Sequence, residues 1–255
     1  DQQMLVGATS GFMEVNAGEV KYNGGDTVKI PTLSVDGLAN YDRDNGYNRG
    51  AVSLTYEDFK LTQDRGRKFS LDAMEVDESN FLATGTNVMS TFQVEQVIPE
   101  VDAYRYSKIA AYAKQGNRKT DAFTPSAANI IDQLNKEIVE IEDLVGETGD
   151  LVIVMSTRVQ SVLNSAAGAK GMLDVANFEH GAYNTRVRTY NGIPIIAVPS
   201  ARMKSQYTFN DGKTAGQEKG GFKADTAAKA INWIIMSKRA AIAVSKTDKM
   251  RIFDP

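Results

Sequence analysis

One stretch of the chain, residues 72–116, carries apolar side chains at the three-to-four-residue spacing of a helix. These side chains are Val88, Phe92, Val94, Val97, Val101, Tyr104, Ile109 and Tyr112. At about 1.5 Å per residue, a helix of about 35 residues would be about 50 Å long, which exceeds the diameter of a small domain. Two consecutive core helices are the alternative. Pro99 lacks the N–H that a helix interior uses, so we expect a bend or a local break there rather than two antiparallel helices.

Weak alternation of apolar and polar positions predicts an extended β-region before this helix. Strands are expected at residues 19–22, 27–33 and 52–56, with renewed alternation at 69–71. Asn23-Gly24-Gly25 is a hairpin signal. The alternation changes parity at Phe59, which predicts a bulge or turn at Glu57-Asp58. A two-stranded ribbon is marginal in water, so it must lie on the rest of its own chain or on another chain.

The second half of the chain alternates between helical and strand patterns. Thr124 and Pro125 predict the start of a helix that runs to about residue 145, with a stripe that consists of Ile130, Leu134, Ile138, Ile141 and Val145. A buried strand at 151–155 and a helix at 157–165, capped by Ser156, follow. Strands are also expected at 185–190, 193–198, 231–236, 241–244 and 250–253. Residues 168–181 are expected to be irregular, and residues 203–224 to form a mobile loop. This order of elements predicts an α+β fold.

Two details of these later strands follow from turn and proline chemistry. Asn191-Gly192 predicts a hairpin between the strands at 185–190 and 193–198. Pro194 cannot donate to a ladder, so it predicts an edge position or a bulge for the second strand. Residues 1–15 have no clear period and are interpreted as an arm.

Composition narrows the class of protein. The chain has 255 residues, of which 42% are hydrophobic, so it can bury a substantial core. Its net charge is -3, which does not favour tight nucleic-acid binding. It has no cysteine, which excludes disulfides and thiolate sites. No signal peptide and no run of apolar residues long enough to cross a membrane is visible.

Catalytic signals are sparse. The single histidine, His180, cannot form a histidine-rich zinc site, and no Gly-x-Ser-x-Gly elbow surrounds any serine. The segment Asn210-Asp211-Gly212-Lys213-Thr214 resembles the end of a phosphate loop, but Tyr207 stands where that motif needs its first glycine. A turn explains this segment. We therefore assign no catalytic, cofactor-binding or metal-binding residue, expect no cofactor, and expect that the chain is not an enzyme.

Four stretches together resemble the major capsid proteins of tailed bacteriophages, which have the Hong Kong 97-type fold. LTQDRGRKFSLDAMEVDESN (61–80) is similar to the family's extended loop where it enters the spine helix. FQVEQVIPEVDAYRYSKIA (92–110) is similar to the proline-containing spine helix. YNGIPIIAVPSARM (190–203) resembles the axial-domain hairpin, and INWIIMSKRAAIAVSKTDKMRIFDP (231–255) resembles the closing strands. The four occur in the family's order across most of the chain.

The resemblance implies a division of the chain. Residues 1–16 would be an N-terminal arm and 17–71 the extended β-hairpin loop. Residues 72–147 would form the spine helix and peripheral domain, 148–230 the axial domain, and 231–255 the closing strands of both domains. The loop would reach over a neighbouring subunit, so we expect inter-subunit contacts from its tyrosines and arginines. These candidates are Tyr41, Arg43, Tyr47, Arg49, Arg65 and Arg67.

The resemblance also implies a function: a shell protein that assembles itself, through pentamers and hexamers, into an icosahedral phage head. Its partners would be copies of itself, scaffolding, portal and decoration proteins, and packaged double-stranded DNA bound without sequence specificity. It would assemble in the host bacterial cytoplasm and reside in the virion. An encapsulin-like nanocompartment shell is the first alternative, and an α+β enzyme of unknown activity is the second.

Overall fold

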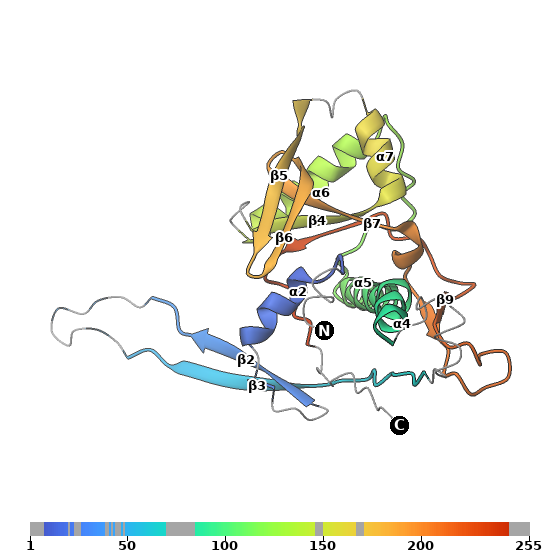
Figure 1. Ribbon diagram of the computed structural model, residues 1–255. Coiled ribbons are helices and arrows are strands. Elements are labelled where there is room, and N and C mark those ends of the chain that lie inside the picture. Colours follow the sequence, from blue (N-terminus) through green and yellow to red (C-terminus); the bar gives the residue numbers. More distant parts are fainter. Residues whose placement is uncertain are drawn as a thin grey trace. The chain divides into compact units, whose positions relative to one another are not determined.

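A computed structural model describes residues 8–19, 21–22, 27–38, 41, 43, 47, 49–69, 85–145, 150–166 and 171–244. The chain divides into two compact units. Unit 1 comprises Asp1–Val15 and Leu71–Pro255, and unit 2 comprises Asn16–Ser70. Helices and strands are mixed, which confirms the α+β class (Figure 1). The finer division into arm, loop, peripheral and axial domains stays a prediction.

The described part of unit 1 is built on one mixed sheet with the strand order β10-β4-β7-β6-β5. Its strands are β4 (Leu151–Ser156), β5 (Leu173–His180), β6 (Tyr183–Tyr190), β7 (Ile193–Val198) and β10 (Trp233–Ser237). Strands β4 and β7 run parallel, and the other neighbours run antiparallel. All six residues of β4 are buried, as expected for a strand that lies inside the sheet and is covered on both faces.

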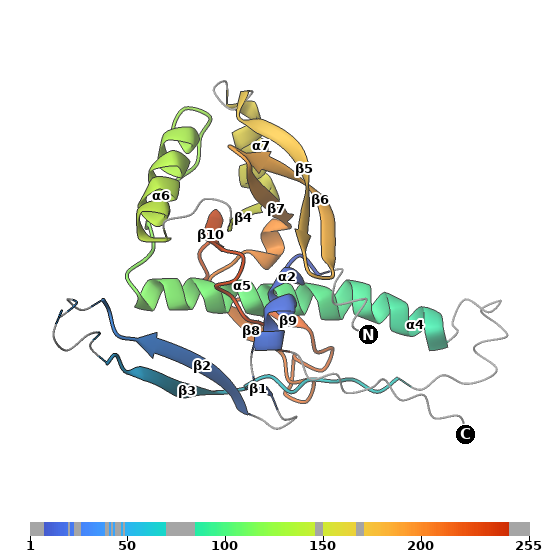
Figure 2. The same ribbon diagram turned by 90° about the vertical axis from the view of Figure 1, so that its left-hand side faces the viewer.

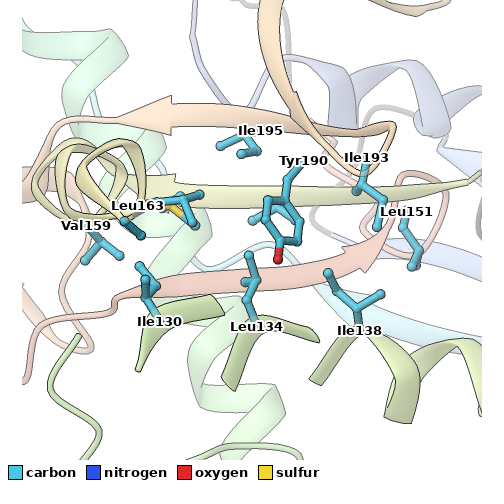
Figure 3. Packing of buried hydrophobic residues seen from close by; sticks show 12 residues of the cluster. Ile130, Leu134, Ile138, Leu151, Val159, Leu163, Tyr190, Ile193 and Ile195 are labelled. Atoms are coloured by element: carbon cyan, nitrogen blue, oxygen red, sulfur yellow. The ribbon is translucent and has the colours of Figure 1, made fainter. Parts of the chain in front are cut away.

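Helices cover both faces of this sheet. On one face, α6 (Ile130–Val145) and α7 (Thr157–Ser165) pack on alternate residues of β4 (Figure 3). The predicted stripe of α6 is confirmed, since Ile130, Leu134 and Ile138 are buried there. On the other face, α2 (Phe12–Val15) and Tyr106 pack on the remaining residues of β4. The N-terminal segment that was expected to be an arm therefore belongs in part to the core, and residues 1–7 lie outside the described residues.

The long helix is present, as α4 (Gly85–Phe92), a π-helical turn η2 (Gln93–Val97) and α5 (Ile98–Gln115) in direct succession (Figure 2). Its predicted start, residues 72–84, lies outside the described residues. The expected local break is confirmed as an interruption of the α-helical hydrogen-bond pattern, because the π-helical turn directly precedes α5, whose second residue is Pro99. A π turn widens the helix where proline cannot donate its hydrogen bond.

The buried face of this helix differs from the predicted stripe. Val94 and Tyr112 are exposed, whereas Ile98, Asp102 and Tyr106 are buried. These three residues are four positions apart, so they lie on one face of the helix. The buried face therefore contains a carboxylate that a search for apolar periodicity could not include.

Four predicted elements of unit 1 differ in the structure, each for a specific reason. Helix α6 begins at Ile130 and not at Thr124, because the Asn129 side chain accepts from Ser126 N (2.7 Å) and donates to the Thr124 carbonyl (3.1 Å). Residues 168–181 contain the edge strand β5, whose backbone pairs with β6 despite few apolar side chains. Residues 241–244 form no strand, since Ala243 N donates to the Met13 carbonyl instead.

The fourth concerns residues 203–224, which contain a short hairpin and are not a simple loop. Strands β8 (Tyr207–Phe209) and β9 (Phe222–Ala224) pair, and their aromatic rings pack edge to face, Tyr207 with Phe222 and Phe209 with Tyr104 of α5. The ring centroids of Tyr207 and Phe222 lie 5.5 Å apart. Aromatic packing thus orders this hairpin on α5. The predicted strand at 250–253 lies outside the described residues.

The predicted turn at Asn191-Gly192 is confirmed, with positive φ at both residues. Pro194, however, lies in β7 between two neighbouring strands, so its predicted edge position is wrong. The pair that closes a two-residue turn exchanges both hydrogen bonds, so the next pair, Thr189 with Pro194, exchanges none. The ladder with β4 begins only at Ile195. The proline therefore occupies a position where neither neighbour needs its N–H.

Unit 2 is a ribbon made of β1 (Lys21–Tyr22), β2 (Thr27–Val35) and β3 (Val52–Lys60). Strands β2 and β3 pair without interruption from Thr27↔Lys60 to Val35↔Val52. The predicted bulge at Glu57-Asp58 is therefore wrong, and Phe59 lies on the opposite face from Tyr56. Residues 61–69 form no strand, and the rest of the predicted strand pattern at 69–71 lies outside the described residues.

We predict that Gly181→Ala destabilises the protein more than Gly212→Ala. Both glycines have positive φ, which costs about 1–2 kcal/mol for a residue with a Cβ. Only at Gly181 would the Cβ also overlap a side chain, since it would lie 2.4 Å from Val15 Cγ1. Overpacking adds about 1–3 kcal/mol. Urea denaturation measures the difference, and Val15→Ala should recover part of the Gly181→Ala loss. Equal losses for the two glycine variants would contradict this packing.

Candidate functional site

One face of the ribbon in unit 2 is apolar along its outer half. Directly opposed residues of β2 and β3 share a face, and successive pairs alternate between faces. The apolar face of the ribbon, as used here, consists of Pro31, Leu33, Val35, Val52, Leu54 and Tyr56. The other face carries hydroxyl pairs, Thr32 with Thr55 and Ser34 with Ser53. The two strands alone thus form an amphipathic surface.

The ribbon's own strands leave this apolar face open. Leu33 is 66% exposed and Leu54 53% exposed, although they lie opposite each other. The outer half of the ribbon consists of β2 and β3 alone, since β1 pairs only with Val28 and Lys29, and two strands have no second layer with which to bury such side chains. Lys29 and Asp58, joined at 3.5 Å, close the apolar face at one end. A protein surface with this pattern is typical of an interaction site.

The loop at the end of the ribbon contains four of the predicted contact residues. Asp36 closes the loop, since its backbone N donates to the Ala51 carbonyl (3.1 Å) and its carboxylate accepts from Ala51 N (2.7 Å). The rings of Tyr41 and Tyr47 come together, with centroids 5.1 Å apart. All six candidates are exposed: Tyr41, Arg43, Tyr47, Arg49, Arg65 and Arg67.

A second site lies inside unit 1, where the fully buried carboxylate of Asp102 binds the N-terminal strap, defined here as residues 8–15. The Asp102 Oδ1 atom accepts from Ser10 N (3.0 Å) and Ser10 Oγ (2.6 Å). The Oδ2 atom accepts from Thr9 N (3.3 Å), Thr9 Oγ1 (2.8 Å) and Arg202 Nη1 (3.1 Å). Five donors thus saturate one carboxylate, which makes its burial tolerable.

Neighbouring side chains extend this network along α5. Arg105 donates to the Ser10 carbonyl (3.3 Å) and forms a salt bridge with Glu14. Tyr106 OH donates to Thr9 Oγ1 (3.1 Å). Burial and then the Asp102 charge raise the pKa of Tyr106 well above its ordinary value. The same two causes raise the pKa of Tyr183 to about 12.

This cluster holds structure together and has no features of an acid–base centre. A general base needs a free lone pair within reach of a substrate proton, whereas both Asp102 oxygens are occupied and buried. Sequence reasoning missed the cluster. The available signal was the position of Asp102, four residues after Ile98 and four before Tyr106 on one helix face.

The other candidates for chemistry have structural explanations. His180 is the last residue of β5 and lies opposite Tyr183. Asp211 forms a turn, since its Oδ1 atom accepts from Lys213 N and Thr214 N. Hydrogen bonds, first that from the Thr214 hydroxyl, lower the pKa of Asp211 to about 2. Within the described ranges there is no group of side chains that could hold a metal ion, and no helix long and apolar enough to cross a membrane.

We predict that Asp102→Asn destabilises the protein by about 3–5 kcal/mol, because Arg202 and the strap donors lose their charged acceptor. Urea denaturation measures this change. The pKa of Tyr183 should also fall from about 12, since Asp102 contributes to its rise. The control is Asp143→Asn on an exposed helix face, for which a change within about 0.5 kcal/mol is expected. A similarly small effect of Asp102→Asn would refute the role of this carboxylate in holding the strap.

No family model, curated protein or solved structure matches this chain. What the protein does has therefore to be inferred from its surfaces, its buried polar groups and the family resemblance of its sequence.

Proposed function

We propose that this chain is the major shell protein of a tailed-bacteriophage head, with the Hong Kong 97-type fold, and that copies of it assemble into a closed icosahedral shell around double-stranded DNA. The observation that carries the proposal is the apolar face of the ribbon, which two strands cannot bury by themselves. A neighbouring copy that covers it would make the ribbon an element of assembly.

The order of elements supports the same proposal. A ribbon comes before a long helix that contains a proline. A sheet follows, in which a two-residue turn joins β6 to β7. This order is the one implied by the family resemblance of the sequence. A contact in which one patch binds a different patch on the next copy generates rings when the rotation closes. A curved lattice of such rings would form the shell.

The interior of a head would have to release its DNA. Each phosphate contact by a lysine or arginine adds salt-dependent affinity, and the net charge of -3 does not favour many such contacts. The proposal assigns no catalytic residue. DNA protected from nuclease inside purified particles separates a phage head from the encapsulin-like alternative, which would enclose a protein cargo instead.

We predict that the substitution pair Leu33→Lys and Leu54→Lys abolishes closed shells. These residues oppose each other on the apolar face, so two charges there would have to be buried unpaired against a neighbouring copy. The matched control is Ser34→Lys with Ser53→Lys, the adjacent pair on the hydroxyl face. The control should retain shells, because it adds the same charges to the other side of the ribbon.

Sedimentation velocity of both variants, prepared as for wild-type particles and with a co-expressed scaffolding protein if one is needed, measures the outcome. Circular dichroism checks that both variants fold equally. Shells from the leucine variant in normal yield would rule out burial of the apolar face in assembly.

A further inference from the structure

Helix α6 of unit 1 presents an outer face that nothing in the described part of the chain covers. This outer face of α6 lies opposite its buried stripe and consists of Asp132, Lys136, Val139, Glu140, Asp143 and Leu144, all exposed. It combines negative charge with apolar surface, since Val139 is 53% and Leu144 77% exposed. Surfaces of this kind mark contacts with other proteins.

The charges on this helix are unfavourable within a single copy. Glu140 and Asp143 lie toward the C-terminal end of α6, where the helix dipole is negative and where no basic residue is present in the last turn. Lys136 reaches Glu140 at 4.0 Å, which is the one ion pair on this face among the described residues. Cations from another molecule would relieve this repulsion.

A complementary surface lies at the other end of the same sheet (Figure 2). Helices α6 and α7 pack on β10, β4 and β7 and cover Tyr190 and Leu173, where the hairpin of β5 and β6 joins the rest of the sheet, but its outer part is exposed on that side. Alternate residues of β5 and β6 lie on the same face of the sheet as Tyr190. We call the exposed residues among them the arginine face. It consists of Val175, Asn177, Glu179, Asn184, Arg186 and Arg188.

The arginines of this face are available for a charged partner. The side chain of Arg188 donates to the amide oxygen of Asn164 (2.9 Å), which orients it without neutralising it. Neither Arg186 nor Arg188 forms an ion pair with a described carboxylate. Val175, 48% exposed, lies directly opposite Arg188 on the neighbouring strand. The face thus places positive charge beside apolar surface.

The charge order of the two faces matches. Along the hairpin, Arg188 and Arg186 come first, and Glu179 lies beyond them toward the turn. Along α6, Asp143 and Glu140 come first, and Lys136 lies beyond them. Residues 136–143 of a helix span about 10 Å, and residues 184–188 of a strand span about 14 Å. Arg186 and Arg188 can therefore meet Glu140 and Asp143 while Glu179 meets Lys136. Val139 and Val175 would lie within the same contact.

We propose that the outer face of α6 in one copy binds the arginine face of the next copy. The contact joins two different patches on opposite ends of unit 1, so it is heterologous, and repetition of it forms a ring. It rests on the proposed shell function and specifies which surfaces of unit 1 meet within a ring. Complementary charges set the register of the contact and speed the association of the two copies. The apolar side chains of Val139, Leu144 and Val175 supply buried surface.

Charge reversal tests this pairing. Arg186→Glu with Arg188→Glu, and separately Glu140→Lys with Asp143→Lys, should each lose assembled particles at a concentration at which the wild type assembles, because like charges then face each other. A chain with all four substitutions, or a one-to-one mixture of the two variants, should recover assembly. Native mass spectrometry and electron microscopy give the readout.

Two controls separate assembly from folding and from net charge. The α6 variant should melt no lower than the wild type, since lysines suit a helix C-terminus. Lys213→Glu with Lys223→Glu changes the net charge as the arginine variant does, at exposed positions elsewhere, and should still assemble.

Shells from both reversed variants, or loss without recovery in the four-substitution chain and in the mixture, would overturn this pairing and leave the proposed function standing. A wild type that never assembles would overturn the proposed function itself.

Discussion

The fold of unit 1 depends on one buried carboxylate. Asp102 lies on the buried face of the long helix, with a side chain that is 0% exposed, and it is stable there only because the strap and Arg202 supply its donors. That network places Phe12 and Met13 of the strap on the sheet face that α6 and α7 do not reach. The strap in turn accepts a backbone hydrogen bond from Ala243. Segments from both ends of the described chain thus meet at one helix through a polar interaction.

The two units differ in how completely each buries its own apolar side chains. In unit 1, both sheet faces carry packed clusters, and one hydroxyl, Ser200 Oγ, is the only buried side-chain polar atom without a partner among the described residues. In unit 2, the strands satisfy their backbone ladder but leave the apolar face of the ribbon in solvent. A sequence keeps such a surface when another molecule covers it, which is why we interpret the ribbon as an element of assembly.

Local rules predicted the parts of the fold in which one strong pattern dominates. The continuous apolar run of β4, the stripe of α6 and the Asn191-Gly192 turn are examples. Those rules failed where tertiary context decides. Strand β5 has few apolar residues and is ordered by pairing with β6. Asp102 interrupts an apolar stripe, and its donors lie more than ninety residues away in sequence. The exposed tyrosines and arginines of the ribbon could be selected from composition, but the apolar face could not. The change in apolar alternation at Phe59 suggested a bulge, and only the pairing register of β2 with β3 shows that there is none.

The proposed function requires that copies of this chain close into a shell. Negative-stain electron microscopy of the expressed protein, with scaffolding protein and protease co-expressed, tests it most directly. We expect closed, uniform, hollow particles with icosahedral outlines. Only small soluble oligomers under every assembly condition would contradict it.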